Sequence, residues 1–87
     1  MGKTEAIITC QVAFYPLGTS TIAAPVREVL EIINSYDLIK VEINAVSTLL
    51  QGDISKVYDL LEEISTVMVE KNIKYAMSVN ISNQCGC

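Results

Sequence analysis

Three stretches of the chain alternate apolar and polar residues, a pattern typical of β-strands with two unlike faces. These stretches run from about Glu5 to Tyr15, from about Ile39 to Val46 and from about Lys74 to Ser82. A shorter apolar segment, from about Thr48 to Gln51, predicts one more strand, which we expect to form a hairpin with the strand before it, turning near Val46-Ser47. The pattern therefore predicts four strands.

Two other segments repeat apolar residues at the spacing of an amphipathic helix. The first runs from about Ile22 to Ser35, with Ser20 or Thr21 as its N-cap candidates and Pro25 in its first turn, where proline is tolerated. One face of this helix carries the apolar set Ile22, Val26, Val29, Leu30 and Ile33. We expect this face to pack against the sheet.

The second helix follows Gly52-Asp53, which we expect to break the strand before it, with Asp53 or Ser55 as N-cap. Its apolar stripe consists of Val57, Leu60, Leu61, Ile64, Val67 and Met68. The order strand-helix-strand-strand-helix-strand predicts one α+β domain over residues 1–87, a ferredoxin-like βαββαβ sandwich. Right-handed crossovers place both helices on one face of a four-stranded antiparallel sheet, with the first and third strands in the centre.

The sheet face that the helices leave open is predicted to be mostly polar and uncharged. Its members are Thr9, Gln11, Ala13 and Tyr15, then Glu42, Asn44 and Val46, then Ser78 and Asn80, whereas Ile8, Cys10, Val12, Phe14, Tyr75, Met77, Val79 and Ile81 belong under the helices. A solvated sheet face explains such residues. A subunit interface, or a pocket for a neutral or cationic ligand, explains them as well.

The first strand ends at Pro16 and Gly18 and leads into the polar loop Gly18–Thr21. Such a loop before a helix can build a small-molecule site, or it can be an ordinary connection. Cys85-Gly86-Cys87 can be a flexible tail with free thiols, a strained disulfide or a soft-metal ligand, but two thiols are too few for a closed zinc site.

Composition and charge narrow the classes of function. A net charge of −4 with scattered basic residues excludes a concentrated nucleic-acid surface. A hydrophobic content of 51% in 87 residues suggests that another subunit covers part of the surface. No stretch of the sequence resembles a transmembrane or secretory segment. The chain contains no histidine, P-loop or dinucleotide-binding motif. We therefore expect a cytoplasmic protein that is not an enzyme and uses no metal or cofactor.

Three segments resemble the YkoF-like family of thiamine- and hydroxymethylpyrimidine-binding proteins: CQVAFYPLGT (10–19), NAVSTLLQGD (44–53) and VNISNQCG (79–86). The resemblance extends from about Ala6 to Gly86, although the proline that follows the C-terminal cysteine in the tandem-domain branch is missing here. It implies a ferredoxin-like domain that binds thiamine or its pyrimidine precursor without chemistry, in thiamine salvage or transport. It also implies a homodimer or homotetramer formed through the open sheet face.

The resemblance also implies where the ligand binds. Ser47 and Thr48 match the pair expected to contact the pyrimidine, and Tyr15 and Thr19 match positions beside the pocket. Asn80 and Ser82 match polar positions in the last strand. The other reading of Ser47 and Thr48 is a hairpin turn that needs small polar residues.

The chemistry of thiamine adds three further candidates. Gln11 and Asn44 can match the hydrogen-bonding edge of an aminopyrimidine. Glu42 and the ring of Tyr15 can accept the thiazolium cation. The competing hypothesis is a regulatory or oligomerisation module of the same fold that binds a different small ligand or none.

Overall fold

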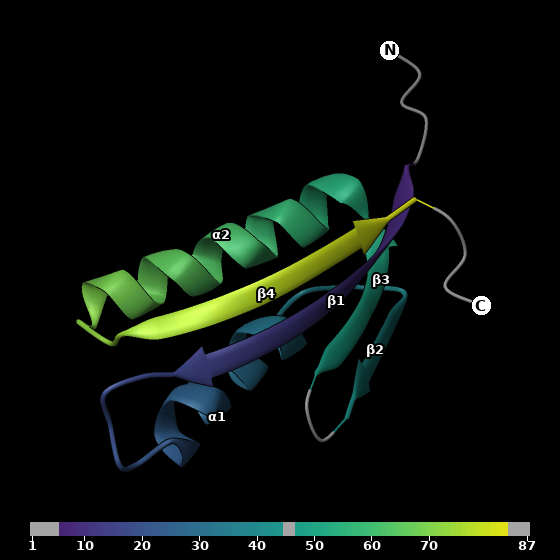
Figure 1. The fold of residues 1–87 in the computed structure, drawn as a ribbon. Coiled ribbons are helices and arrows are strands. Elements are labelled where there is room, and N and C mark those ends of the chain that lie inside the picture. The colour runs from purple at the N-terminus through teal and green to yellow at the C-terminus, as the bar shows by residue number, and fades with distance from the viewer. Residues whose placement is uncertain (1–5, 45–46, 84–87) are drawn as a thin grey trace.

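The computed structural model describes residues 6–44 and 47–83. Its elements in chain order are β1 (Ile7–Pro16), α1 (Ala23–Asn34), β2 (Lys40–Ile43), β3 (Thr48–Asp53), α2 (Ile54–Glu70) and β4 (Tyr75–Ser82). The strands form an antiparallel sheet in the order β2-β3-β1-β4, and both helices cover the same face of it (Figure 1). This confirms the predicted ferredoxin-like α+β fold. No helix within the described ranges is long and apolar enough to cross a membrane.

Strand β3 is longer than the sequence pattern predicts. We expected Gly52-Asp53 to break it, but Gly52 pairs with Ile8 and Asp53 with Ile7, so the strand continues through both. Gly52 is buried, and a Cβ atom there would lie 2.8 Å from Cδ2 of Leu38. The glycine therefore lets the connection after α1 pack closely on the strand, since any larger residue would displace Leu38.

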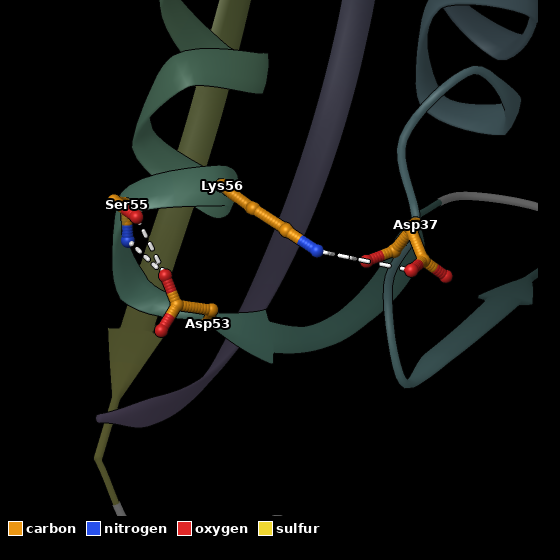
Figure 2. Close-up of polar contacts among 4 residues, drawn as sticks. All are labelled: Asp37, Asp53, Ser55 and Lys56. Carbon is orange, nitrogen blue, oxygen red and sulfur yellow. Dashed lines mark hydrogen bonds and ion pairs between the residues drawn. The ribbon is translucent and has the colours of Figure 1, made fainter. Parts of the chain in front are cut away.

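The start of α2 is fixed by a hydrogen-bonded cap (Figure 2). The Asp53 carboxylate accepts a hydrogen bond of 3.1 Å from the Ser55 amide and another from the Ser55 hydroxyl, which confirms Asp53 as N-cap. Lys56 donates to the backbone oxygen of Asp37 at 3.3 Å, and its Nζ lies 3.8 Å from the Asp37 carboxylate. The first turn of α2 is thus also joined to the connection that follows α1.

The start of α1 is different. Its N-cap is Ile22, which makes no side-chain capping bond, so the prediction of Ser20 or Thr21 was wrong. The hydroxyl of Thr19 instead accepts a 3.1 Å hydrogen bond from the Thr21 amide, which forms a small turn before the helix. Pro25 lies buried in the first turn, as expected.

Strand β2 ends at Ile43, earlier than predicted, and the Asn44 amide donates to the Ser47 carbonyl at 2.8 Å. This bond agrees with a hairpin between β2 and β3, although Ala45 and Val46 lie outside the described residues. The cysteine tail predicted from Cys85 to Cys87 also lies outside them.

The core lies between the sheet and the two helices. Its fully buried members include Cys10 and Leu50 from the sheet and Val57, Leu60, Ile64 and Met68 from α2. Ile8 and Val12 are also buried, which confirms the predicted inward face of β1. Ile81 pairs with Cys10 and shares that face, but it is 39% exposed because β4 lies at the edge of the sheet.

Candidate functional site

A cavity of about 460 Å³ lies between α1 and the sheet, next to the ends of β1 and β2 and the start of β3. All five residues predicted to form the apolar face of α1 line it: Ile22, Val26, Val29, Leu30 and Ile33. The sheet and its adjoining residues contribute Val12, Phe14, Tyr15, Pro16, Ile43, Asn44, Ser47 and Thr48. The cavity is therefore a continuation of the core that side chains do not fill.

The wall of the cavity is mostly apolar, and several of its residues are open to solvent. Tyr15, Ile22 and Ile43 remain 48%, 57% and 54% exposed. Phe14 on the sheet side is held by a stacked contact with Tyr75, with ring centroids 5.5 Å apart. Large apolar side chains gathered around one opening indicate a surface that is covered in the working state of a protein.

Polar groups enter the cavity lining where the β2–β3 hairpin meets the sheet. Thr48 pairs with Val12 of β1 and with Ile43 of β2, and directly paired residues of antiparallel strands project to the same face. Because both partners line the cavity, Thr48 faces the helix layer with them. Asn44 and Ser47 line the same end, so uncharged polar residues adjoin the apolar wall there.

The eight predicted contact residues do not form one site. Ser47, Thr48, Tyr15 and Asn44 line the cavity, as reported above. Gln11 pairs with Leu49 and Asn80, and Glu42 also pairs with Leu49, so these residues share the open sheet face on the other side. Thr19 lies in the turn before α1 and does not line the cavity. The structure therefore brings four of the eight residues together at the cavity and places the other four elsewhere.

A side-chain hydrogen bond links Gln11 of β1 to Ser47, the residue before β3. The side-chain amide of Gln11 donates to the Ser47 hydroxyl, with Nε2 and Oγ 3.2 Å apart. Glu42 remains apart from this contact, and its carboxylate lies 3.6 Å from the Lys40 ammonium on the same strand.

The electrostatics of the cavity are neutral. Among the described residues that line it, none carries a formal charge. Two groups with shifted pKa values lie elsewhere. Burial raises the pKa of the Cys10 thiol to about 11, and a 2.7 Å hydrogen bond to Glu63, with some burial and nearby carboxylates, raises the pKa of Tyr36 to about 12. Both shifts favour the neutral, unreactive form.

The apolar wall is the part of the site that the sequence did not reveal. Val12, Phe14, Val29 and Ile33 were predicted as core residues, and their spacing is the same whether they fill a core or surround a cavity. The signal in the sequence that pointed to this wall was the apolar face of α1. That face was predicted correctly, but it was interpreted as packing against the sheet.

The comparisons with known proteins agree with this fold. The family described as the YKOF-related Family matches residues 7–87. UPF0045 protein MJ1052 of Methanocaldococcus jannaschii is 27% identical over 78 residues, which are 88% of this chain and 77% of that protein. Its crystal structure superposes with a TM-score of 0.77, at 28% identity, covering 94% of this chain and 84% of that one.

A second solved structure resembles the fold without close sequence similarity. It is described as a candidate thiamine biosynthesis/salvage protein from Thermotoga maritima, with a TM-score of 0.79, 17% identity and coverage of 92% of this chain and 86% of that one. A domain of unknown function from Bacillus cereus gives a TM-score of 0.78 at 15% identity, covering 94% and 80%. At these identities the likeness concerns the fold alone. The match over residues 7–87 shows that the chain belongs to the YKOF-related family.

Proposed function

We propose that this protein binds thiamine or its hydroxymethylpyrimidine half in the cavity between α1 and the sheet, without catalysis, and that it serves thiamine salvage or transport. The observation that carries the proposal is a solvent-accessible apolar cavity with uncharged polar groups at one end. Membership of the YKOF-related family supports it, as does the fold shared with a candidate thiamine biosynthesis/salvage protein.

The size and lining of the cavity suit a small heteroaromatic ligand. Small-molecule sites commonly enclose about 300–1,000 Å³ and combine apolar walls with a few polar groups that fix orientation. A volume of about 460 Å³ falls in this range. Val26 and Val29 on α1 face Val12 and Phe14 across the cavity, and a flat ring between them would bury both of its faces. Asn44, Ser47 and Thr48 can then match the donors and acceptors at the ring edge.

The charge of the site distinguishes among the forms of thiamine. The neutral lining accepts an uncharged pyrimidine without a desolvated ion. We expect the thiazolium cation to lie at the opening, near Tyr15, which is half exposed and carries an aromatic ring that can accept a cation. A diphosphate would meet no cationic side chain among the described lining residues. We therefore expect the protein to bind thiamine or hydroxymethylpyrimidine with higher affinity than thiamine diphosphate.

The chemistry of the lining supports the proposal of binding without catalysis. The chain has no histidine, and the described residues around the cavity include no carboxylate, thiol or amine that could act as base or nucleophile. The site can hold and orient a ligand, but it offers no group to transfer a proton near neutral pH.

A regulatory or oligomerisation module is the second candidate function. The open sheet face is formed by mostly uncharged residues such as Gln11, Ser78 and Asn80, which suits a homodimer or homotetramer. Under this alternative the open face binds a second copy of the protein, and the protein binds no thiamine-like ligand. The two functions differ in one measurable property, a response to thiamine.

Isothermal calorimetry against thiamine, hydroxymethylpyrimidine and thiamine diphosphate tests the proposal, with light scattering to follow the oligomeric state. We expect saturable binding of the first two, weakened about tenfold or more when Ser47→Ala and Thr48→Ala remove both hydroxyls. The matched control is Ser65→Ala with Thr66→Ala, a Ser-Thr pair on α2 that does not line the cavity. No heat from the folded oligomer would favour the second candidate, and normal binding by the Ser47/Thr48 variant would place the site elsewhere.

A further inference from the structure

Strand β4 forms an edge of the sheet without the features that usually protect such edges. Proteins commonly keep exposed edge strands short, or place charged residues, proline or bulges in them, which prevents pairing with another chain. The segment YAMSVNIS of β4 contains no charged residue or proline, and its register with β1 is continuous over eight residues. The opposite edge, β2, has four residues, and Lys40 and Glu42 among them are charged. The unprotected edge is therefore β4.

The hydrogen-bonding pattern shows which backbone groups point outward from β4. The Leu17 amide donates to the Lys74 carbonyl at 2.9 Å, and Pro16, which has no N–H group, comes next in the ladder. Hydrogen-bonded and non-hydrogen-bonded pairs alternate along antiparallel strands. The residues whose backbone groups point away from β1 are therefore Tyr75, Met77, Val79 and Ile81. No hydrogen bond to these outward groups occurs within residues 6–44 and 47–83.

Helix α2 presents an exposed apolar row on the same side of the molecule. Because α2 connects β3 to β4 across β1, it covers the half of the sheet that ends in β4 (Figure 1). Lys56 and Glu63 of α2 make hydrogen bonds with the connection that follows α1, so their flank of the helix faces α1. The opposite flank carries Ile54, Tyr58 and Leu61 at a spacing of i, i+4 and i+7. Ile54 and Tyr58 are 39% and 49% exposed, which places an apolar row beside the unprotected edge.

We propose that β4 pairs with β4 of a second copy of this chain, in antiparallel orientation. The two sheets then form one continuous sheet, and the two α2 helices lie side by side over the junction. A two-fold axis at Ser78 lets all four outward residues form hydrogen bonds. Tyr75 then pairs with Ile81 of the second copy, and Met77 with Val79. These residues share the helix side of the sheet, so apolar side chains meet apolar side chains.

Charge and symmetry favour a second copy over a strand from a different protein. Each chain has a net charge of −4, but the segment from Tyr75 to Ser82 is uncharged, so two copies meet along it without repulsion between adjacent side chains. The two-fold axis also brings the Tyr58 flanks of both α2 helices together, whereas a single added strand would leave them exposed. The pairing uses neither the open sheet face nor the cavity beside α1.

Amide hydrogen exchange of the full chain tests the pairing without any substitution. The Val79 amide should become protected when β4 pairs with its copy. The matched control is the Ile43 amide at the β2 edge, which follows the same alternation because the Asn44 amide next to it bonds to Ser47. We expect Val79 to exchange about 100-fold more slowly than Ile43 in concentrated protein. A Val79 amide that exchanges as fast as that of Ile43 would overturn the proposal.

A proline at position 79 tests the same hydrogen bonds by self-association. Val79→Pro removes an outward N–H and leaves the ladder to β1 intact, since edge strands tolerate proline where the nitrogen faces outward. Val79→Ala is the matched control, because it shortens the same side chain and keeps the N–H. Sedimentation should show at least about 30-fold weaker association for Val79→Pro than for Val79→Ala, because two hydrogen bonds are lost across the axis. Equal association of the two variants, or a monomeric wild type, would contradict the pairing.

Gln11→Lys separates this interface from association through the open sheet face. Gln11 lies on β1 within that face, where it pairs with Leu49 and Asn80. A charge there opposes contact between two open faces but does not touch the β4 edge. The Val79 amide should therefore stay protected in Gln11→Lys. Loss of its protection would show that the open face, and not β4, holds the two copies together.

Discussion

The two helices cover one sheet with similar apolar patterns but very different packing. On α2, Val57, Leu60, Ile64 and Met68 have no exposed surface. On α1 the burial is uneven: Ile33, near the end of the helix, is 1% exposed, whereas Ile22, at its start, is 57% exposed. The unfilled volume of about 460 Å³ lies entirely on the α1 side. The difference indicates that α2 and its half of the sheet stabilise the domain, whereas α1 borders a cavity.

Length and capping account for part of this difference. Helix α2 has 17 residues and an N-cap, Asp53, whose carboxylate accepts two hydrogen bonds from Ser55. Helix α1 has 12 residues and begins at Ile22 without a side-chain cap. An ion pair between Glu28 and Lys71 joins α1 to the end of α2. Helix α1 is thus held by its buried residues and by the contact with α2, and Ile22 at its start remains exposed beside the cavity.

The largest expected effect on stability concerns the core beneath α2. Leu60→Ala should lower the free energy of unfolding by about 2–5 kcal/mol, because Leu60 is fully buried and its neighbours can collapse only partly. Leu30→Ala, the same change on α1, should cost about 1 kcal/mol, because Leu30 is half-buried beside space that is already open. Urea denaturation of both variants measures the contrast. Equal losses would mean that the two halves are packed alike.

The next largest effect concerns ligand binding in the cavity beside α1. Val26→Phe should fill the cavity and weaken binding of hydroxymethylpyrimidine about 100-fold, while the free energy of unfolding stays within about 1 kcal/mol of the wild type, since the added ring enters empty space. Calorimetry and urea denaturation check the two parts. A folded variant with full affinity would show that the ligand binds outside this cavity.

A pH effect tests the tightness of the core around Cys10. Its thiol has a pKa of about 11 in the folded protein against 9.0 when unperturbed. The folded state therefore holds the thiol proton more strongly than the unfolded state does. The stability that the protonated Cys10 thiol contributes is fully present below pH 9 and is lost as the pH rises from about 9 to 11. We expect a loss on the order of 2 kcal/mol relative to Cys10→Ala over this range. Parallel stability curves for the two proteins would mean that the thiol is not desolvated.

The smallest effect concerns the cap of α2. Asp53→Ala should lower the free energy of unfolding by about 1 kcal/mol, because the Ser55 amide loses its acceptor. Ser20→Ala, a change at a predicted cap of α1 that the structure does not use, should leave stability unchanged. Thermal unfolding of both variants tests this, and equal destabilisation would remove the distinction between the two helix starts.

The sequence predicted the order of the elements, the sheet topology and both apolar helix faces, because each follows from local periodicity and handedness. It placed Gln11 on the open face, but it did not distinguish on which face of β3 Thr48 lies. That distinction depends on the pairing of Thr48 with Val12, which local patterns do not fix. Gly52 was misread as a strand breaker because its reason, the close approach of Leu38, is a tertiary contact.

The candidate site was predicted only in part for the same reason. Ser47 and Thr48 were identified from their resemblance to a family motif, and the structure places both in the cavity lining. Glu42 was selected for its chemistry and Asn80 from the family resemblance, and both were predicted on the open face, where the strand register places them. Whether an apolar helix face closes a core or borders a cavity depends on how well the facing side chains fill the space, and that is decided by three-dimensional packing.

The most direct test of the central claim is an NMR titration of the isotopically labelled protein with hydroxymethylpyrimidine. The cavity assignment predicts the largest shifts at residues such as Val26, Ile43 and Thr48, and little change at Ser78 and Asn80 on the open face. Shifts confined to the open face, or a spectrum unchanged at saturating ligand, would contradict a binding site between α1 and the sheet.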